Sequence, residues 1–283
     1  MNKTLTIIGA GKVGKTLGRL WSLNGTFTVQ DVLTRSALSA QQAVDFIDAG
    51  RPIVHFSALQ PADIYLIAVP DDQIESCCAA LADTGLLAAG NIVFHCSGAR
   101  SSALLSSAAQ CGAAVASIHP IRSFAIPAQV VKHFAGTYCG AEGEAHALAL
   151  MHVAFTEIGA EWVMIDTDAK IIYHAASVFA SNYLVTLLDV AQQAYVQSGI
   201  APDVALKLMG PLVRETTENV LRSGTLKALT GPIARGDLAT VETQQRAVAT
   251  WDALHGALYD QFVPLTMMLA ARKHTTEKEP TPS

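Results

Sequence analysis

The sequence predicts an α/β protein with a doubly wound, Rossmann-type sheet followed by an all-helical C-terminal domain. A short apolar run at residues 5–8 leads directly into a glycine-rich turn that opens a helical pattern. Apolar runs of strand length then alternate with helical patterns up to residue 165, as in doubly wound sheets. No strand pattern follows that point. We therefore expect a dinucleotide-binding domain at 1–165, a helical substrate and dimerisation domain at 166–272, and a polar, disordered tail at 273–283.

The glycine turn has the spacing G-x-G-x-x-G between a strand and a helix, which is the context that dinucleotide binding requires. Gly9 can make the tight turn, Gly11 leaves room for a pyrophosphate, and Gly14 lets the helix pack closely on the strand. The helix N-terminus presents free N–H groups to the phosphates. The predicted cofactor-binding residues of this turn are Gly9, Ala10, Gly11, Lys12, Val13 and Gly14.

The second strand, expected at 27–33, ends in Thr34, Arg35 and Ser36 rather than in an acid. Folds that bind NAD usually place an acid at this tip to hold the ribose 2′-hydroxyl, and Asp31 lies too early for that role. An arginine beside two hydroxyls suits a 2′-phosphate. The alternative is a loop arginine followed by a helix cap. We expect NADP as the cofactor, in preference to NAD.

Further elements of the first domain follow from apolar periodicity. The predicted helices lie at 39–49, at 71–82, at 101–110 and at 142–158, and the predicted strands at 52–56, 64–69, 91–94, 113–118, 136–140 and 161–165. Val69 and Pro70 end a fully apolar strand. Because strand ends line the ligand crevice of such sheets, we place both residues beside the cofactor.

Two other strands end in histidine, at His95 and at His119. Both are candidates for catalysis or for orienting a substrate on the ligand side of the sheet, although a structural role is the alternative for each. Ser97 follows His95 closely in sequence. We therefore count it as a candidate contact for cofactor and for substrate.

The composition excludes several functional classes. The 283 residues are 51% hydrophobic and 15% charged, with a net charge of -5 and no basic stripe, so nucleic acid is not an expected partner. The five cysteines contain no C-x-x-C, which favours reduced thiols in the cytoplasm and indicates no metal site. The chain starts directly with a strand and carries no secretory signal pattern. The apolar stretch 171–191 contains polar residues and is better explained as a buried helix than as a membrane span.

The second domain is expected to contain helices at 169–198, 202–223 and 239–271, with Pro264 as the point where the last could be interrupted. The first of them is apolar nearly all round, which is more than a small domain can bury. We therefore expect a homodimer that pairs through the C-terminal helices.

With these residues placed, the chain resembles the two-domain NAD(P)-dependent reductases typified by 6-phosphogluconate dehydrogenase, a superfamily that includes pyrroline-5-carboxylate and ketopantoate reductases. It is most similar to a bacterial family of Rossmann-like proteins whose C-terminal domain has no assigned function. The matching segments are GAGKVG (9–14), LTRS (33–36), AVPDD (68–72), FHCSGA (94–99), SIHPIRSF (117–124), KIIYHAASVFASNYLV (170–185) and LTGPIARGDLATV (229–241). One departure is Gln244 and Gln245, where relatives are expected to carry a histidine.

The resemblance implies an NADP-dependent oxidoreductase that reduces a small carbonyl or imine compound in the interdomain cleft. Lys170 and His174 share one helix face, and one or the other is the expected general acid, with Asn182 further along the same polar stripe. Arg235 either binds a substrate carboxylate or pairs with Asp237. An exposed lysine and an interface histidine are the structural alternative. A non-catalytic NADP-binding sensor and a deazaflavin-dependent reductase are the alternative functions.

Overall fold

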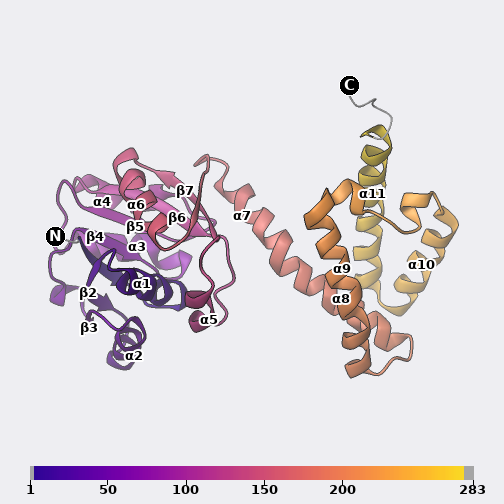
Figure 1. Ribbon diagram of the computed structural model, residues 1–283, viewed down its shortest axis with the longest axis horizontal. Coiled ribbons are helices and arrows are strands. Elements are labelled where there is room, and N and C mark those ends of the chain that lie inside the picture. Colours follow the sequence, from indigo (N-terminus) through magenta and orange to yellow (C-terminus); the bar gives the residue numbers. More distant parts are fainter. Residues whose placement is uncertain (1–2, 277–283) are drawn as a thin grey trace. The chain divides into compact units, whose positions relative to one another are not determined.

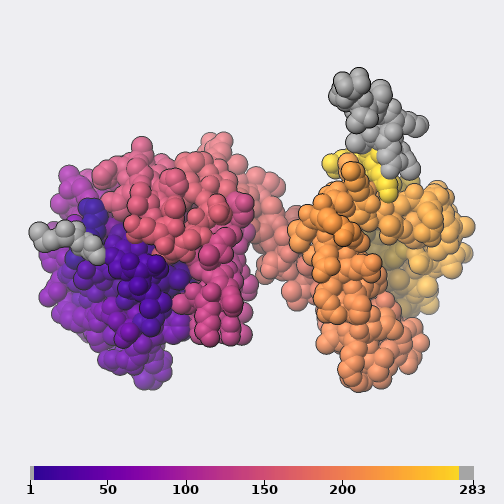
Figure 2. Space-filling view, viewed as in Figure 1, coloured from indigo at the N-terminus to yellow at the C-terminus, as the bar shows by residue number. Residues whose placement is uncertain are grey.

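The computed structural model describes residues 3–276 and divides into two compact units, Met1–Ser181 and Asn182–Ser283. In the space-filling view the first unit, from indigo through magenta, forms one packed body (Figure 2). The boundary lies later than the one predicted after residue 165. It does so because the helix that begins at Lys170 is bonded to the sheet through that lysine and through Tyr173.

The first unit contains one sheet of eight strands, in the order β3-β2-β1-β4-β5-β6-β7-β8 (Figure 1). All neighbours pair in parallel except β6 and β7, which are antiparallel. Strands β2 and β3 lie on one side of β1, and β4 to β8 lie on the other. The strand order therefore reverses between β1 and β4, and open α/β sheets bind ligands at such a switch point. The strands are β1 (Thr4–Ile8), β2 (Thr28–Leu33), β3 (Arg51–Ile53), β4 (Ile64–Ile67), β5 (Ile92–His95), β6 (Ala114–Pro120), β7 (Tyr138–Gly143) and β8 (Glu161–Met164).

Helices cover both faces of this sheet. The α-helices are α1 (Lys12–Asn24), α2 (Ala37–Ile47), α3 (Ile74–Ala82), α4 (Ser106–Gln110), α5 (Pro127–Lys132), α6 (Ala145–Glu157) and α7 (Lys170–Val178). Short 3-10 helices are η1 (Phe56–Ala58), η2 (Asp71–Gln73) and η3 (Ser102–Leu105). The predicted doubly wound fold is confirmed, and α5 is an additional helix that the apolar pattern did not indicate.

The core forms two layers because side chains alternate along each strand. In β4, Ile64 and Leu66 face the layer that contains Trp21, whereas Tyr65 and Ile67 face the layer under α3. Trp21 is fully buried and joins α1 to α6, since its indole N–H donates to the Ala154 carbonyl over 3.0 Å. Both faces of the central strands are therefore apolar, as the continuous runs in the sequence indicated.

One predicted boundary in this unit is wrong in a way that matters for the site. Residues 142–158 were expected as a helix, but β7 continues to Gly143 and α6 begins at Ala145. Glu142 is therefore a strand residue, opposite Ser117 in the β6–β7 ladder. The ladder outweighs the helical preference of the glutamate because its neighbours on both sides pair with β6.

The second unit is helical. Its elements are α8 (Leu184–Gln197), α9 (Pro202–Ala228), η5 (Ile233–Arg235), α10 (Leu238–Trp251) and α11 (Ala253–Thr276). The predicted interruption at Pro264 is wrong: α11 passes through it, and the break falls at Asp252, whose carboxylate accepts a hydrogen bond from the His255 amide. Of the predicted tail, residues 273–276 belong to α11 and the remainder lies outside the described residues.

A π-helical turn, Phe179–Tyr183, joins α7 to α8 and spans the boundary between the units. Across this turn, Lys170–Gln197 is long and apolar enough to cross a membrane, judged by length and composition alone. The first residue of that helix is 1% exposed and bonded to the sheet. Its start is thus part of the packed first unit, but none of its most apolar stretch is buried, so the prediction of a buried helix at 171–191 is wrong.

Candidate functional site

The glycine turn has the geometry that dinucleotide binding needs. Gly9 has φ +84, and a Cβ there would lie 2.6 Å from Cγ1 of Val69. A Cβ on Gly14 would lie 2.5 Å from the Gly9 carbonyl oxygen, so the helix and the strand touch at this point. A Cβ on Gly11 would meet no described atom within 4 Å. The turn is therefore closed around Gly9 and Gly14 and open at Gly11, where a pyrophosphate would approach.

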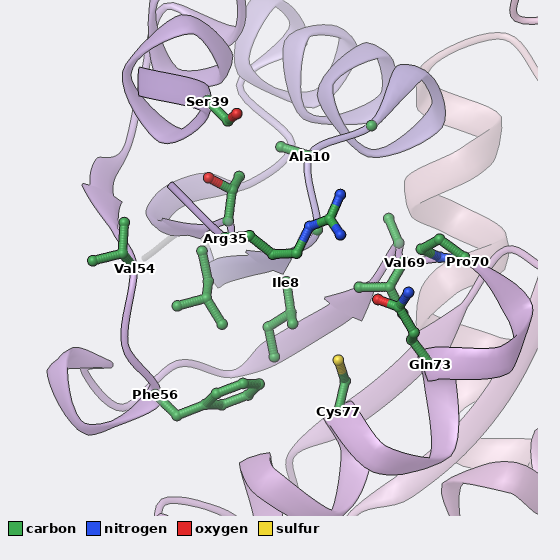
Figure 3. A pocket seen from close by; sticks show the side chains of 15 residues that line it. Ile8, Ala10, Arg35, Ser39, Val54, Phe56, Val69, Pro70, Gln73 and Cys77 are labelled. Atoms are coloured by element: carbon green, nitrogen blue, oxygen red, sulfur yellow. The ribbon is translucent and has the colours of Figure 1, made fainter. Parts of the chain in front are cut away.

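A cavity of about 440 Å³ opens beside this turn, between the ends of β1, β2 and β4. Its lining residues are Ile8, Gly9, Ala10, Gly11, Leu33, Thr34, Arg35, Ser39, Val54, Phe56, Ala68, Val69, Pro70, Gln73 and Cys77. Figure 3 shows Ser39 on one side of this pocket, Phe56 and Cys77 on the other, and Arg35 extending across it. Apolar walls with a few polar groups at one end are typical of cofactor pockets.

The structure brings most of the predicted cofactor residues to this pocket. Of those in the turn, Lys12, Val13 and Gly14 form the start of α1 and do not line the cavity. Val69 and Pro70 line it, as expected from their place at the end of β4. Ser97 lies elsewhere, with its hydroxyl donating to Asp71 over 2.8 Å.

The tip of β2 is arranged differently from the prediction in one respect. Ser36 caps α2, because its hydroxyl accepts from the Ser39 amide, and Thr34 donates to the Ser36 carbonyl. Ser36 is thus the helix cap of the alternative interpretation, while Arg35 and Ser39 face the pocket. Asp31 is fully buried and accepts hydrogen bonds from Arg51 and from the Gln60 amide. Its carboxylate is therefore not available at the pocket.

Further along the sheet, the ends of β5 and β6 meet the start of α7. His95 is fully buried, and both of its ring nitrogens contact the chain: Nε2 lies 3.1 Å from the Ser101 carbonyl and Nδ1 accepts from the Ser97 amide. Burial lowers its pKa to about 4, so the ring is neutral near pH 7. In this arrangement His95 supports the loop that follows β5.

Lys170 lies in a closed polar cluster, which we call the lysine cluster: Lys170, Ser117, Glu142, Ser102 and Thr167. The lysine Nζ donates to the Ser117 hydroxyl over 2.7 Å and lies 3.5 Å from Glu142 Oε1. The Glu142 carboxylate also accepts from the Ser102 amide, the Ser102 hydroxyl and Thr167. Burial lowers the pKa of Lys170, and the nearby Glu142 opposes that effect. Every polar group of the cluster thus has a partner within the chain.

His119 and His174 belong to a second group, the histidine cluster: His119, Tyr173, His174 and Gly98. Nδ1 of His119 lies 3.0 Å from the Tyr173 hydroxyl, and the His119 and His174 rings lie edge to face with centroids 5.7 Å apart. A Cβ on Gly98 would lie 2.9 Å from His119 Nε2 and would also clash with His174 Nδ1. Within the described residues, the buried Nδ1 of His174 has no hydrogen-bond partner. This cluster is half-buried and incompletely bonded.

The four predicted catalytic residues are therefore gathered at one edge of the first unit in three settings: His95 supports the loop after β5, Lys170 lies in the lysine cluster, and His119 and His174 lie in the histidine cluster. The predicted substrate residues Asn182 and Arg235 belong to the second unit, and their role stays a prediction. Asp237 caps α10 through Thr240, and the described residues contain no ion pair between it and Arg235. Gln244 accepts from Tyr259 and Gln245 donates to Asp260, so both join α10 to α11.

Sequence reasoning missed Glu142, Tyr173 and the Phe56 wall of the pocket. Glu142 was placed on a helix, and Tyr173 was passed over in favour of its neighbour His174. Tyr173 lies three residues after Lys170, which was a signal for a shared helix face. Among residues 3–276, no group of three or more His, Cys, Asp or Glu side chains is arranged to hold a metal ion.

Comparison with known proteins agrees with this architecture. Residues 2–120 match the Rossmann-like domain and residues 137–264 match a domain of unknown function, DUF2520. The chain matches no curated protein. The crystal structure of protein TM1727 from Thermotoga maritima is 25% identical, with a TM-score of 0.75 over 95% of this chain and 99% of that one.

Two named reductases share the fold at lower identity. An imine reductase from Myxococcus stipitatus, solved in complex with NADP+, is 17% identical with a TM-score of 0.66 over 95% of this chain and 94% of its own. A pyrroline-5-carboxylate reductase from Coxiella burnetii is 17% identical with a TM-score of 0.61, over 99% of this chain and 100% of its own. A variant of the imine reductase is known with NAD+. The chain thus carries a Rossmann-like match and a DUF2520 match in succession, as the resemblance implied, and the second match begins just before β7 of the first unit.

Proposed function

We propose that the chain is an NADP-dependent oxidoreductase that reduces a small carbonyl or imine compound. The observation that carries the proposal is the glycine turn: it is closed at Gly9 and Gly14, open at Gly11, and continuous with a pocket that ends at Arg35. Amides at the start of α1 bind the pyrophosphate, because the first amides of a helix have no partner within it. The named reductases of the same fold support the general activity.

The preference for NADP rests on the tip of β2. Asp31 is held by Arg51 and Gln60, so it does not accept a ribose hydroxyl. Arg35 faces the pocket with Ser39 beside it, and both sit at the N-terminus of α2, where an anion is favourable. When bound, the reduced nicotinamide would supply a hydride. The chain's own residues would hold that cofactor in place and bind the substrate heteroatom that becomes negatively charged.

Fluorescence titration with NADPH and NADH tests the cofactor assignment. Replacing Arg35→Ala is expected to raise the Kd for NADPH about 10- to 50-fold and to leave NADH within about twofold, because the lost contact is a charge-assisted one. Arg246→Ala, an exposed arginine on α10, is the matched control. Equal weakening of both cofactors by Arg35→Ala would contradict the preference for NADP.

A non-catalytic NADP-binding sensor is the second candidate. It is favoured by the lysine cluster, in which the most obvious catalytic residue is 1% exposed and bonded within the chain. NADPH oxidation against a panel of keto acids and cyclic imines separates the two functions. Turnover of any of these compounds supports the reductase, whereas tight NADPH binding without turnover supports the sensor.

We also propose that two copies of the chain pair through the C-terminal helices. The described residues of the second unit that are buried are Ala205, Met209, Val241, Gly256 and Ala270. Large apolar side chains on its helices are exposed, among them Val185, Leu212 and Leu265. Large apolar side chains exposed on several helices of one unit favour an interaction surface. Light scattering during gel filtration should give twice the chain mass of 29.8 kDa, and a monomer would overturn this proposal.

A further inference from the structure

The histidine cluster contains a residue that sequence patterns did not single out, Tyr173. We propose that Tyr173 is a positioning residue: it holds His119 with the Nε2 proton over Gly98, where His119 and Nδ1 of His174 form the hydrogen-bonding site for the reacting oxygen or nitrogen of the substrate. The identity of that ligand rests on the proposed reductase function. The orientation of His119 does not, and it can be tested separately.

The contact between Tyr173 and His119 is specific. The hydroxyl lies 3.0 Å from Nδ1, and the two rings are nearly perpendicular, at 88° with centroids 5.7 Å apart. His119 is fixed by β6, where it pairs with Gly140 of β7, and Tyr173 is fixed by the first turn of α7. The hydrogen bond thus links a strand end to a helix start.

The direction of this hydrogen bond follows from the Tyr173 hydroxyl itself. Burial raises the pKa of that hydroxyl to about 12, so it keeps its proton at neutral pH. Among residues 3–276, this hydroxyl is hydrogen-bonded to Nδ1 of His119, so Nδ1 is the acceptor available for its proton. Nδ1 is then the acceptor of the ring, and Nε2 carries the hydrogen.

His119 is neutral in this setting. Its pKa is lowered to about 4, first by burial, then by His174 and Lys170, with Asp71 acting in the opposite direction. A neutral imidazole with its hydrogen on Nε2 donates a hydrogen bond without adding a full positive charge. Such a donor stabilises charge that develops on a reacting oxygen or nitrogen.

Two glycines make the arrangement possible. A side chain at Gly98 would occupy the position where the edges of His119 and His174 lie, and one at Gly140 would clash with the Tyr173 hydroxyl. Nδ1 of His174 and Nε2 of His119 both lie against Gly98. Among the described residues, this Nδ1 has no hydrogen-bond partner. A donor and a buried ring nitrogen without a partner therefore lie together against Gly98, and a polar ligand atom would supply the missing partner.

Nuclear magnetic resonance of the full chain labelled with ¹⁵N-histidine tests the orientation without any ligand. The resonances of His119 are assigned by their loss in His119→Gln. At pH 7 we expect a neutral ring with its proton on Nε2. In Tyr173→Phe we expect a mixture of tautomers and a titration midpoint about one pH unit higher, because the neutral ring loses a hydrogen bond. Tyr138→Phe, which removes an exposed hydroxyl from the same strand as Gly140, should change neither.

In the unaltered chain, a proton on Nδ1 of His119 or a charged His119 ring at pH 7 would overturn the proposal. This test does not depend on whether Tyr173→Phe folds. An unchanged tautomer in a folded Tyr173→Phe would do the same. Neither result bears on NADPH binding, so failure here is distinct from failure of the proposed function. If the panel yields a substrate, Tyr173→Phe should lower kcat at least fivefold and leave the Kd for NADPH unchanged; an unchanged kcat would refute the substrate role.

Discussion

The lysine cluster joins the start of α7 to β6, β7 and η3, and the histidine cluster joins it to β6 and to the loop after β5, yet their polar groups are satisfied to different degrees. Lys170 and Glu142 are each only 2% exposed in their side chains, and their hydrogen bonds are met by Ser117, Ser102 and Thr167. In the histidine cluster, Nδ1 of His174 is left without a partner among the described residues. A fully bonded buried network fixes structure, whereas a partly bonded one can bind a ligand.

Breaking the lysine cluster should have the largest effect. Lys170→Met leaves the Glu142 carboxylate buried without its cation, and we expect a loss of ~3–5 kcal/mol of unfolding free energy in urea denaturation. The double variant Lys170→Met with Glu142→Gln should recover part of that loss. Asp203→Asn breaks an exposed pair with Lys207 and should cost at most ~0.5 kcal/mol. If Lys170→Met were as stable as the unaltered chain but had no turnover, the result would instead indicate that Lys170 is catalytic.

Crowding the histidine cluster should affect activity more than stability. In Gly98→Ala the new methyl group displaces His119 and His174, and turnover should fall about 100-fold because the reacting groups are misplaced. The pocket residues are untouched, so the Kd for NADPH should stay within about twofold. Gly210→Ala is the control, since its added Cβ would meet its nearest atom at 3.5 Å. Unchanged turnover in Gly98→Ala would remove this cluster from the active site.

The pH dependence of stability tests the lowered pKa values of two histidines, His95 and His119. The pKa of His95 and that of His119 are both about 4 in the folded chain, below the ordinary 6.5. The unfolded chain therefore binds more protons between these values, and stability falls as the pH drops from about 6.5 towards 4. His119→Gln should reduce the loss between pH 7 and 4.5 by about 2 kcal/mol, measured in urea. An identical pH profile in the variant would contradict the lowered pKa.

The loop that separates the two clusters should give the smallest effect. The Ser97 hydroxyl donates to Asp71 and accepts from the amides of Ala99 and Arg100, so it shapes the turn that carries Gly98. Ser97→Ala should cost about 1 kcal/mol, because two amides lose their acceptor. Thermal unfolding is the measurement, and Ser76→Ala on the exposed side of α3 is the control. A Kd for NADPH raised more than about fivefold would favour the predicted role of Ser97 as a cofactor contact.

Local patterns identified most of the first unit. The strand and turn around Gly9, the buried strand before Val69 and the helix cap alternative at Ser36 all depend on residues within a few positions of each other. The histidines at the ends of β5 and β6 were found because strands of one sheet end at a shared edge. Glu142 was missed because its placement depends on pairing with β6, which is distant in sequence. The break at Asp252 is local instead: its carboxylate accepts from the His255 amide three residues later, whereas α11 continues through Pro264.

The sequence by itself determined the order of elements, the glycine turn and the set of histidines and lysine that gather at one edge. These features follow from hydrophobic periodicity and from backbone needs that each residue carries with it. Tertiary structure decided which of those side chains are closed off and which remain open. Lys170 and His95 are enclosed by carbonyls, hydroxyls and a carboxylate from other strands and loops, while Tyr173 hydrogen-bonds to His119 beside Gly98. Burial and hydrogen bonding are properties of the packed neighbours, and no single segment contains them.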